Sequence, residues 1–180
     1  LSQYPTTAVA VDIAVHEYTH GVVSAITRNA FQNNGMTGSL SEGYSDVMAV
    51  LMTDDWSIGE EWVGKATKKI KKLRDVSNPN GSKEVAEKGP EKLSDPLYAE
   101  NRQNSDGGAH GNSFLVSHPV YLMHKNGFGS TTQLAKLYYK SLALGYDATS
   151  DWWTMRRNVL KAASIMGCSD AQIQIIKNAF

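Results

Sequence analysis

The sequence predicts a mainly α-helical protein, and three observations lead to this prediction. Apolar residues recur at spacings of three, four and seven along most of the chain, which is typical of helices with one buried face. Residues that favour a helix start precede these segments, and glycines stand where several of them should stop. Residues 76–111 lack this periodicity and are rich in Asn, Pro, Gly, Asp and Ser, so we expect a long irregular loop there.

Length and composition indicate an ordinary globular protein. The 180 residues are 41% hydrophobic and 20% charged, and we expect one helical lobe over residues 1–180. Eighteen basic and eighteen acidic residues cancel, which argues against nucleic acid or an anionic membrane surface as the main partner. No apolar run is long enough to span a membrane. Cys168 is the only cysteine, so no intrachain disulfide can form.

The first helix is expected from Pro5-Thr6-Thr7, which can start a helix, to about Arg28-Asn29. One face is apolar, because hydrophobic residues recur at helical spacing at Ala8, Val11, Val15, Val22 and Ile26. The chain starts at Leu1, without a methionine and almost directly before this helix, so we expect a mature or excised piece of a longer protein.

This helix contains a His-Glu-x-x-His pattern at His16, Glu17 and His20. Residues four apart lie on the same helix face, so both imidazoles can reach one small cation, and zinc accepts that geometry. Glu17 can reach a water on the same metal and act as a general base. The alternative is two surface histidines with a carboxylate between them.

A second helix is expected after residues 32–39, which are turn-rich and too polar for a core element. Ser39 or Ser41 could cap it, and it would carry Glu42 and Asp46 on one face. A catalytic zinc takes three protein ligands, and Glu42 is the best-placed third ligand. Asp46 can accept a hydrogen bond from the other ring nitrogen of a ligand histidine. Otherwise Glu42 is a first-turn acid and Asp46 a surface charge.

Further helices are expected at 65–74, with a solvated cationic face, and at 112–126, 131–144, 150–167 and 169–180. Their starts are indicated by Asn112 or Ser113, Ser130-Thr131, Thr149-Ser150-Asp151 and Ser169-Asp170, and their ends by Gly127, Gly145 and Gly167. Pro119 should kink the 112–126 helix or mark its true start.

Three ordered motifs resemble the thermolysin family of zinc endopeptidases, the gluzincins. They are His16-Glu17-x-x-His20, Glu42-x-x-x-Asp46 and Asp106-Gly107-Gly108-Ala109-His110-Gly111-Asn112-Ser113. The resemblance runs from about Val11 to the C-terminus and implies the helical C-terminal lobe of the catalytic domain. It also implies an extended, turn-like conformation for residues 65–74, in place of a helix.

The resemblance assigns roles to individual residues. Glu17 would polarise the zinc water, and His110 would donate to the developing oxyanion. Arg74 would bind a substrate carbonyl, and Ile13 and Leu73 would line a pocket for a bulky hydrophobic residue after the scissile bond. Taken singly, Arg74 would be a solvated charge, and Ile13 and Leu73 core residues.

A single calcium ion is also implied, with three carboxylates as its ligands: Asp12, Asp55 and Glu60. Thr53 and Ser57 stand where the family often has acids, which argues against a two-ion site. The alternative is an acidic surface turn.

Three positions depart from the family pattern. Phe31 matches a tyrosine that serves as a second oxyanion donor. Ser105 stands where the carboxylate that orients the oxyanion histidine is usual, so Asp106 is the candidate for that role. Ser41 replaces an asparagine before the glutamate ligand and can still form a hydrogen bond.

These observations predict a zinc-dependent endopeptidase that hydrolyses internal peptide bonds of peptides and proteins. The resemblance further implies secretion and a missing N-terminal, β-rich lobe that completes the cleft. One alternative is a catalytically weak or inactive relative in which the zinc fold serves binding or structure. Another is a different gluzincin such as an aminopeptidase, against which the Gly107-Gly108-Ala109-His110 segment argues.

Overall fold

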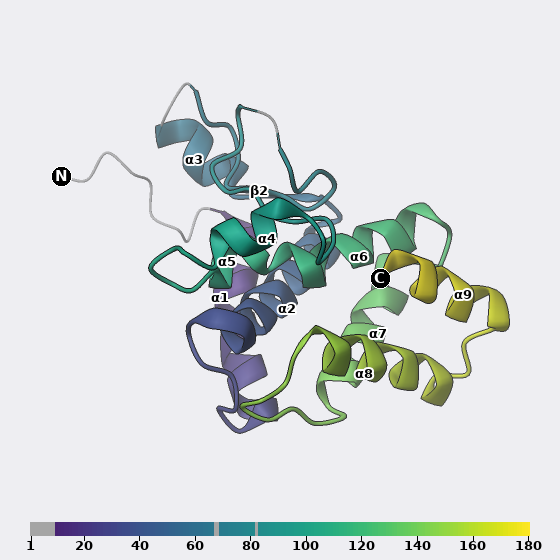
Figure 1. Ribbon diagram of the computed structural model, residues 1–180. Coiled ribbons are helices and arrows are strands. Elements are labelled where there is room, and N and C mark those ends of the chain that lie inside the picture. The colour runs from purple at the N-terminus through teal and green to yellow at the C-terminus, as the bar shows by residue number, and fades with distance from the viewer. Residues whose placement is uncertain (1–9, 67–68, 82) are drawn as a thin grey trace.

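The computed structural model describes residues 10–66, 69–81 and 83–180 of the chain. Helices predominate, as expected, and two short strands pair beside them (Figure 1). The helices are α1 (Val11–Thr27), α2 (Gly35–Thr53), α3 (Glu60–Ala66), α4 (Pro96–Asn101), α5 (Ala109–Asn112), α6 (Phe114–Lys125), α7 (Thr131–Leu142), α8 (Trp152–Ile165) and α9 (Asp170–Ala179). Strands β1 (Ser57–Ile58) and β2 (Arg74–Asp75) are antiparallel, with Ser57 opposite Asp75.

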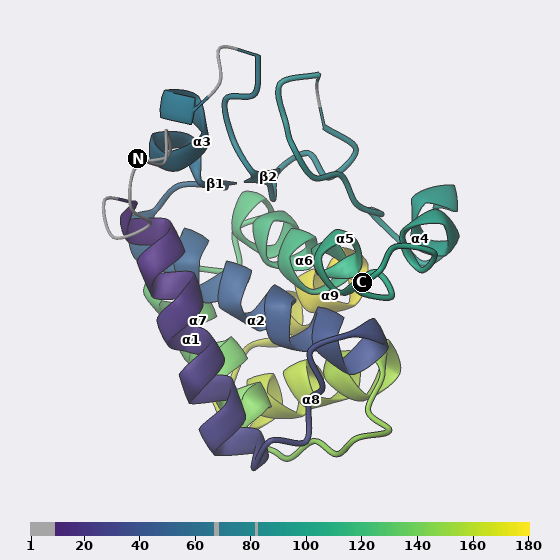
Figure 2. The same cartoon turned by 90° about the vertical axis from the view of Figure 1, so that its left-hand side faces the viewer.

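Helix α2 is the centre of the fold and packs against α1, α5, α6 and α7. The irregular segment between α3 and α4 lies along one edge of the molecule, above α5 and α6, whereas α7 and α8 lie on the opposite side (Figure 2). Buried apolar side chains from the helices form one cluster, which includes Tyr44, Val116, Leu137 and Val159. Within the described residues no helix is long and apolar enough to cross a membrane.

The beginning of α2 differs from the prediction. The helix begins at Gly35, so residues 35–39 are helical, and neither Ser39 nor Ser41 caps it. Thr37 and Ser39 are buried, and the Ser39 hydroxyl donates to the carbonyls of Gly35 and Gly108. Polar residues can be buried when other groups of the protein satisfy their hydrogen bonds. The polarity of residues 32–39 alone therefore predicted the wrong structure.

The helix predicted at 65–74 is wrong, because α3 ends at Ala66 and residues 69–75 are extended or turn-like. Residues 71–73 form backbone hydrogen bonds with neighbouring segments, and these bonds replace those of a helix. This agrees with the conformation that the resemblance implied.

The remaining helices follow the predicted boundaries within a few residues. Ser130 and Ser169 form capping boxes, and the side chain of Asp151 caps α8. Gly127, Gly145 and Gly167 follow α6, α7 and α8 with positive φ angles of 80°, 98° and 70°. Pro119 lies inside α6, which begins five residues earlier at Phe114, so it does not mark the start of the helix. The predicted start of α1 at residues 5–7 lies outside the described residues.

Candidate metal centre

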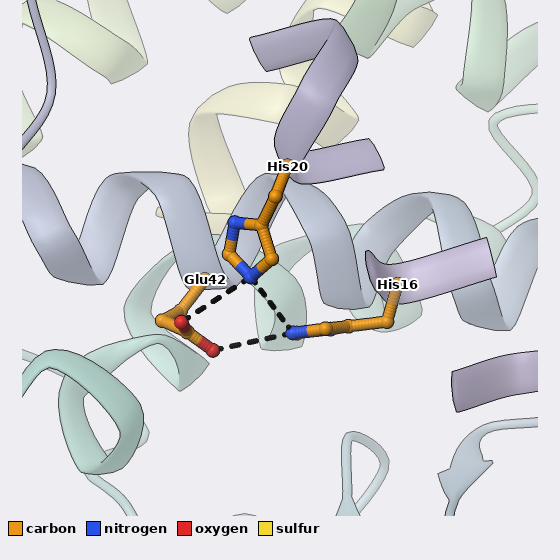
Figure 3. A group of neighbouring side chains, drawn as sticks. All are labelled: His16, His20 and Glu42. Atoms are coloured by element: carbon orange, nitrogen blue, oxygen red, sulfur yellow. Dashed lines mark hydrogen bonds and ion pairs between the residues drawn. The ribbon is translucent and has the colours of Figure 1, made fainter. Parts of the chain in front are cut away.

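Three side chains from α1 and α2 converge on one point (Figure 3). The Nε2 atoms of His16 and His20 lie 3.1 Å apart, and each lies 3.3 Å from a carboxylate oxygen of Glu42. The i, i+4 spacing places both histidines on one face of α1, and α2 crosses that face at Glu42. Among the described residues, no other group of three or more His, Cys, Asp or Glu side chains brings one possible ligand atom each within 4.8 Å of the others.

The spacing of these atoms fits a zinc ion. With zinc–ligand bonds of about 2.0–2.2 Å, the ligand atoms of a tetrahedral site lie roughly 3.3–3.6 Å apart. The three observed separations are at or slightly below that range. Two imidazole nitrogens and one carboxylate are also a donor set that catalytic zinc uses, with one position left open.

Each histidine has a further contact at its other ring nitrogen, and this contact fixes the orientation of the ring. The Nδ1 atom of His16 lies 2.9 Å from Oδ1 of the fully buried Asp46, and the Nδ1 atom of His20 lies 3.0 Å from the Ser41 hydroxyl. The Ser113 hydroxyl in turn donates to Asp46 Oδ2 at 3.1 Å. These contacts turn the Nε2 atom of each ring toward Glu42.

Charges compensate one another within the centre. Burial lowers the pKa of His16, but hydrogen bonds with Asp46 and Glu42 raise it more, to about 9. Burial raises the pKa of Glu42, but hydrogen bonds from His16 and His20 lower it well below its usual range. In the metal-free protein Glu42 is therefore a carboxylate at neutral pH, and His16 holds a proton that a metal would displace.

Arg74, at the first position of β2, is a buried cation beside the centre, with only 3% of its surface exposed. Its guanidinium lies 3.5 Å from Asp46, 3.7 Å from Glu42 and 3.3 Å from Glu87. Burial lowers the pKa of Arg74, but Asp46, Glu87, Glu42 and Glu17 raise it more, so the group stays charged. A solvated surface arginine, the alternative from sequence, is excluded by this burial.

His110 approaches the same centre from α5. Its Nε2 atom lies 3.7 Å from Glu42, while its Nδ1 atom lies 2.7 Å from Asp106. Asp106 also accepts the backbone N–H groups of Gly108 and His110. Burial raises the pKa of Asp106, but these donors lower it below its ordinary value. The carboxylate that accepts the hydrogen bond of the His110 ring is thus that of Asp106, one residue after the exposed Ser105.

The other predicted site residues lie around this group. Glu17 is exposed on α1, next to His16. Ile13 is buried and Leu73 partly buried, and both lie next to Gly59, where an added Cβ would be 2.9 Å from Leu73 and 3.6 Å from Ile13. The structure thus brings Ile13 and Leu73 together, with Leu73 directly before Arg74.

The three carboxylates predicted to bind calcium face one hollow of about 250 Å³ beside α1 and α3. Asp12 accepts the backbone N–H groups of Ile13 and Gly59, and Asp55 accepts that of Ser57. Burial and the charges of Asp55 and Asp12 raise the pKa of Glu60. The carboxylate oxygens of Asp12, Asp55 and Glu60 do not all lie within 4.8 Å of one another, as the ligand atoms of His16, His20 and Glu42 do. Calcium binding stays a prediction.

Phe31, which matches a family tyrosine, packs its ring edge-on against Tyr146 with 5.2 Å between centroids. The Tyr146 hydroxyl is 2.6 Å from that of Tyr44 and belongs to a hydrogen-bonded group with Ser141. This position therefore contributes to packing next to the core.

Two contributors to the centre were not predicted from the sequence. Ser113 was considered as a helix cap, but its hydroxyl binds Asp46, 67 residues away. Glu87 lies in the aperiodic stretch, where no spacing rule applies, although its carboxylate is the one nearest to Arg74. Neither contact has a local signal in the sequence.

Comparison with known proteins decides the family. Residues 29–180 match the family model described as "Thermolysin metallopeptidase, alpha-helical domain". The chain belongs to the thermolysin metallopeptidase family. The matched region contains Glu42, Arg74 and His110, and begins after His16 and His20.

Known members of the thermolysin family are similar over most of the chain. Neutral protease NprE of Bacillus pumilus is 28% identical over 166 residues, which are 90% of this chain and 51% of the relative. Extracellular elastase of Staphylococcus epidermidis is 28% identical over 160 residues, 86% of this chain and 28% of the relative. The precursor of protealysin, a metalloproteinase from Serratia proteamaculans, superimposes with a TM-score of 0.79 at 25% identity, covering 98% of this chain and 57% of that one. The chain therefore spans about half the length of these relatives, or less.

Proposed function

We propose that this chain carries the zinc-binding half of the active site of a zinc-dependent endopeptidase. The observation that carries the proposal is the convergence of His16, His20 and Glu42, with ligand atoms 3.1–3.3 Å apart. Membership of the thermolysin family and relatives named as proteases support it.

Each residue has a role in this proposal. When bound, zinc lowers the pKa of a water and polarises a carbonyl. Glu17 takes the proton of the attacking water as general base. His110, oriented by Asp106, donates its Nε2–H to the developing oxyanion. Arg74 donates to a carbonyl of the bound peptide.

The proposed substrate has a bulky hydrophobic residue on the C-terminal side of the scissile bond. Ile13 and Leu73, which lie together beside Gly59, supply the apolar surface for that side chain. We also propose that the protein is secreted, since one relative is named an extracellular elastase.

The remaining polypeptide is proposed to cover an apolar groove along α1. The groove is a hollow of about 460 Å³ between α1, α2 and α7. Four large side chains that line it are unusually exposed: Val11 (65%), Tyr18 (77%), Met52 (70%) and Tyr139 (53%). Contiguous apolar surface of this kind marks an interface. A second lobe of the same protein fits, because the relatives are about twice as long or longer.

The test uses the full-length protein and an internally quenched peptide whose N-terminus is acetylated. We expect cleavage that stops when a chelator is added, returns with zinc, and is lost in Glu17→Gln at unchanged zinc content. Glu91→Gln, a change of an exposed acid far along the chain, is the matched control and should cleave like the wild type. Cleavage that needs a free N-terminus would indicate an aminopeptidase instead.

The second candidate is a zinc-binding relative without peptidase activity. The packing of Phe31 against Tyr146 favours it, because this position offers no hydroxyl to an oxyanion. Loss of one such donor costs about 10²–10³ in rate. Bound zinc together with cleavage no faster than in Glu17→Gln would establish this candidate and reject the endopeptidase.

A further inference from the structure

Residues 84–87 run beside the segment that leads into Arg74. The backbone N–H of Lys71 donates to the Glu84 carbonyl at 2.8 Å, and the N–H of Glu87 donates to the Leu73 carbonyl at 2.9 Å. Lys72 and Val85 also form a parallel bridge. These bonds fix the register between Glu87 and Arg74.

The end of this segment is held against α5 and α6. At Gly89 an added Cβ would lie 2.2 Å from the Gly111 carbonyl oxygen and 2.2 Å from a ring carbon of Phe114. The side chain of Asn101 donates to the Lys88 carbonyl at 3.3 Å. Glu87 is therefore carried by a backbone that is anchored on both sides.

The Glu87 carboxylate and Glu42 approach the same nitrogen. Nη1 of Arg74 lies 3.3 Å from Glu87 Oε2 and 3.7 Å from Glu42 Oε2. The arginine side chain is 4% exposed and that of Glu87 33%, so the pair lies at the edge of the interior. Without the Glu87 charge, the guanidinium has only Glu42 and Asp46 as anionic partners within 4 Å among the described residues.

We propose that Glu87 is a positioning residue that holds Arg74 in place for the substrate and away from the zinc ligand Glu42. The part that concerns substrate rests on the proposed endopeptidase function. The part that concerns zinc rests only on the three ligands and Arg74.

Two effects follow from removal of the charge. The guanidinium moves toward Glu42 and competes with the metal for the carboxylate, so zinc binds more weakly. The same movement takes Arg74 away from the substrate carbonyl, which weakens substrate binding more than it slows the chemical step.

The experiment compares Glu87→Gln with Glu84→Gln in the full-length protein. Glu84 lies three residues earlier in the same segment, and its carboxylate pairs with the exposed Lys71 at 2.6 Å. For Glu87→Gln we expect an increase in the zinc Kd, measured by chelator competition, of about three- to tenfold. We expect KM for the quenched peptide to rise by a similar factor, with kcat changed less. Glu84→Gln should match the wild type in all three quantities.

A double-mutant cycle tests whether Glu87 acts through Arg74. In an Arg74→Met background, which keeps a long side chain, Glu87→Gln should cause no further change in zinc Kd. Glu87→Asp retains the charge and should recover part of the affinity, which a mere loss of stability would not explain.

The inference is overturned if Glu87→Gln equals Glu84→Gln in zinc Kd, or if its full effect persists beside Arg74→Met. Should the wild-type protein bind zinc but cleave no peptide, the endopeptidase proposal fails, while the zinc Kd still decides the role of Glu87.

Discussion

The Nδ1 atom of His16 lies 2.9 Å from Oδ1 of Asp46, a carboxylate with no exposed surface. The opposite nitrogen of the same ring, Nε2, lies 3.3 Å from Glu42. The His16 imidazole thus lies between the buried carboxylate of Asp46 and that of the proposed ligand Glu42. Because the other oxygen of Asp46 accepts from Ser113 and lies near Arg74, the direction of the His16 ring is set by contacts from α2, from the residue before α6 and from β2.

Replacement of Asp46 by Asn should therefore weaken zinc binding. The amide keeps the shape but loses the charge that makes His16 a better ligand, and we expect an affinity about 10- to 100-fold lower. Chelator competition measures the change. Asp54→Asn, at the exposed C-terminal end of α2, is the control and should leave the affinity unaltered. Equal affinities of the two variants would contradict the role of Asp46.

Zinc affinity should increase with pH above neutrality. The pKa of His16 in the metal-free protein is about 9, because Asp46 and Glu42 outweigh the effect of burial. Zinc must displace that proton, so the apparent affinity should rise about tenfold per pH unit from pH 7 and level off near pH 9. Calorimetry in buffers of different ionisation enthalpy should detect about one proton released at pH 7. An affinity that is constant over this range would show that His16 is already neutral.

The same raised pKa predicts how the stability of the metal-free protein depends on pH. The ordinary pKa of a histidine is 6.5, so the stabilisation from the His16 proton is fully present below pH 6.5. It is lost as the pH rises toward 9. Chemical unfolding of the metal-free protein at pH 6, 7.5 and 9 measures this loss, and His16→Gln should reduce the dependence.

Asp106, and not Ser105, should be needed for the function of His110. Asp106→Ala removes the acceptor 2.7 Å from Nδ1, and kcat for the quenched peptide should fall by about 10- to 100-fold. Zinc content should not change, because His110 is not one of the three converging ligands. Ser105→Ala, which alters an exposed neighbour, should have the wild-type kcat. A larger loss in Ser105→Ala than in Asp106→Ala would reverse the assignment.

Two helical glycines should respond in opposite directions to substitution by alanine. At Gly43 an added Cβ would lie 2.3 Å from Val116 and 2.8 Å from the Ser113 carbonyl, so α2 and α6 must separate. We expect Gly43→Ala to lower the free energy of unfolding by about 1–3 kcal/mol. At Gly21 an added Cβ meets nothing within 4 Å, and Gly21→Ala should raise it by roughly 0.5–1 kcal/mol. Urea unfolding of both variants checks the two signs.

Much of the fold could be predicted from local patterns. Ser130 and Ser169 cap the helices that the spacing predicted, and three glycines follow helix ends with positive φ angles. The predictions were wrong where polar groups form hydrogen bonds with residues distant in the sequence. Residues 35–39 looked like a surface turn, yet Ser39 is buried and bonded to Gly108. Residues 71–73 have helical spacing but form backbone bonds with 58 and 84–87 instead.

The proposed ligands His16, His20 and Glu42 could be identified from the sequence, because an i, i+4 pair on one helix fixes its own geometry and Glu42 lies on the next helix. The partners of these ligands were decided by tertiary packing. Ser113 reaches Asp46 because α6 crosses α2 at Gly43, and Glu87 reaches Arg74 because residues 84–87 lie along 71–73. Contacts of this kind depend on the path of irregular chain between helices, and no short-range periodicity in the sequence encodes that path.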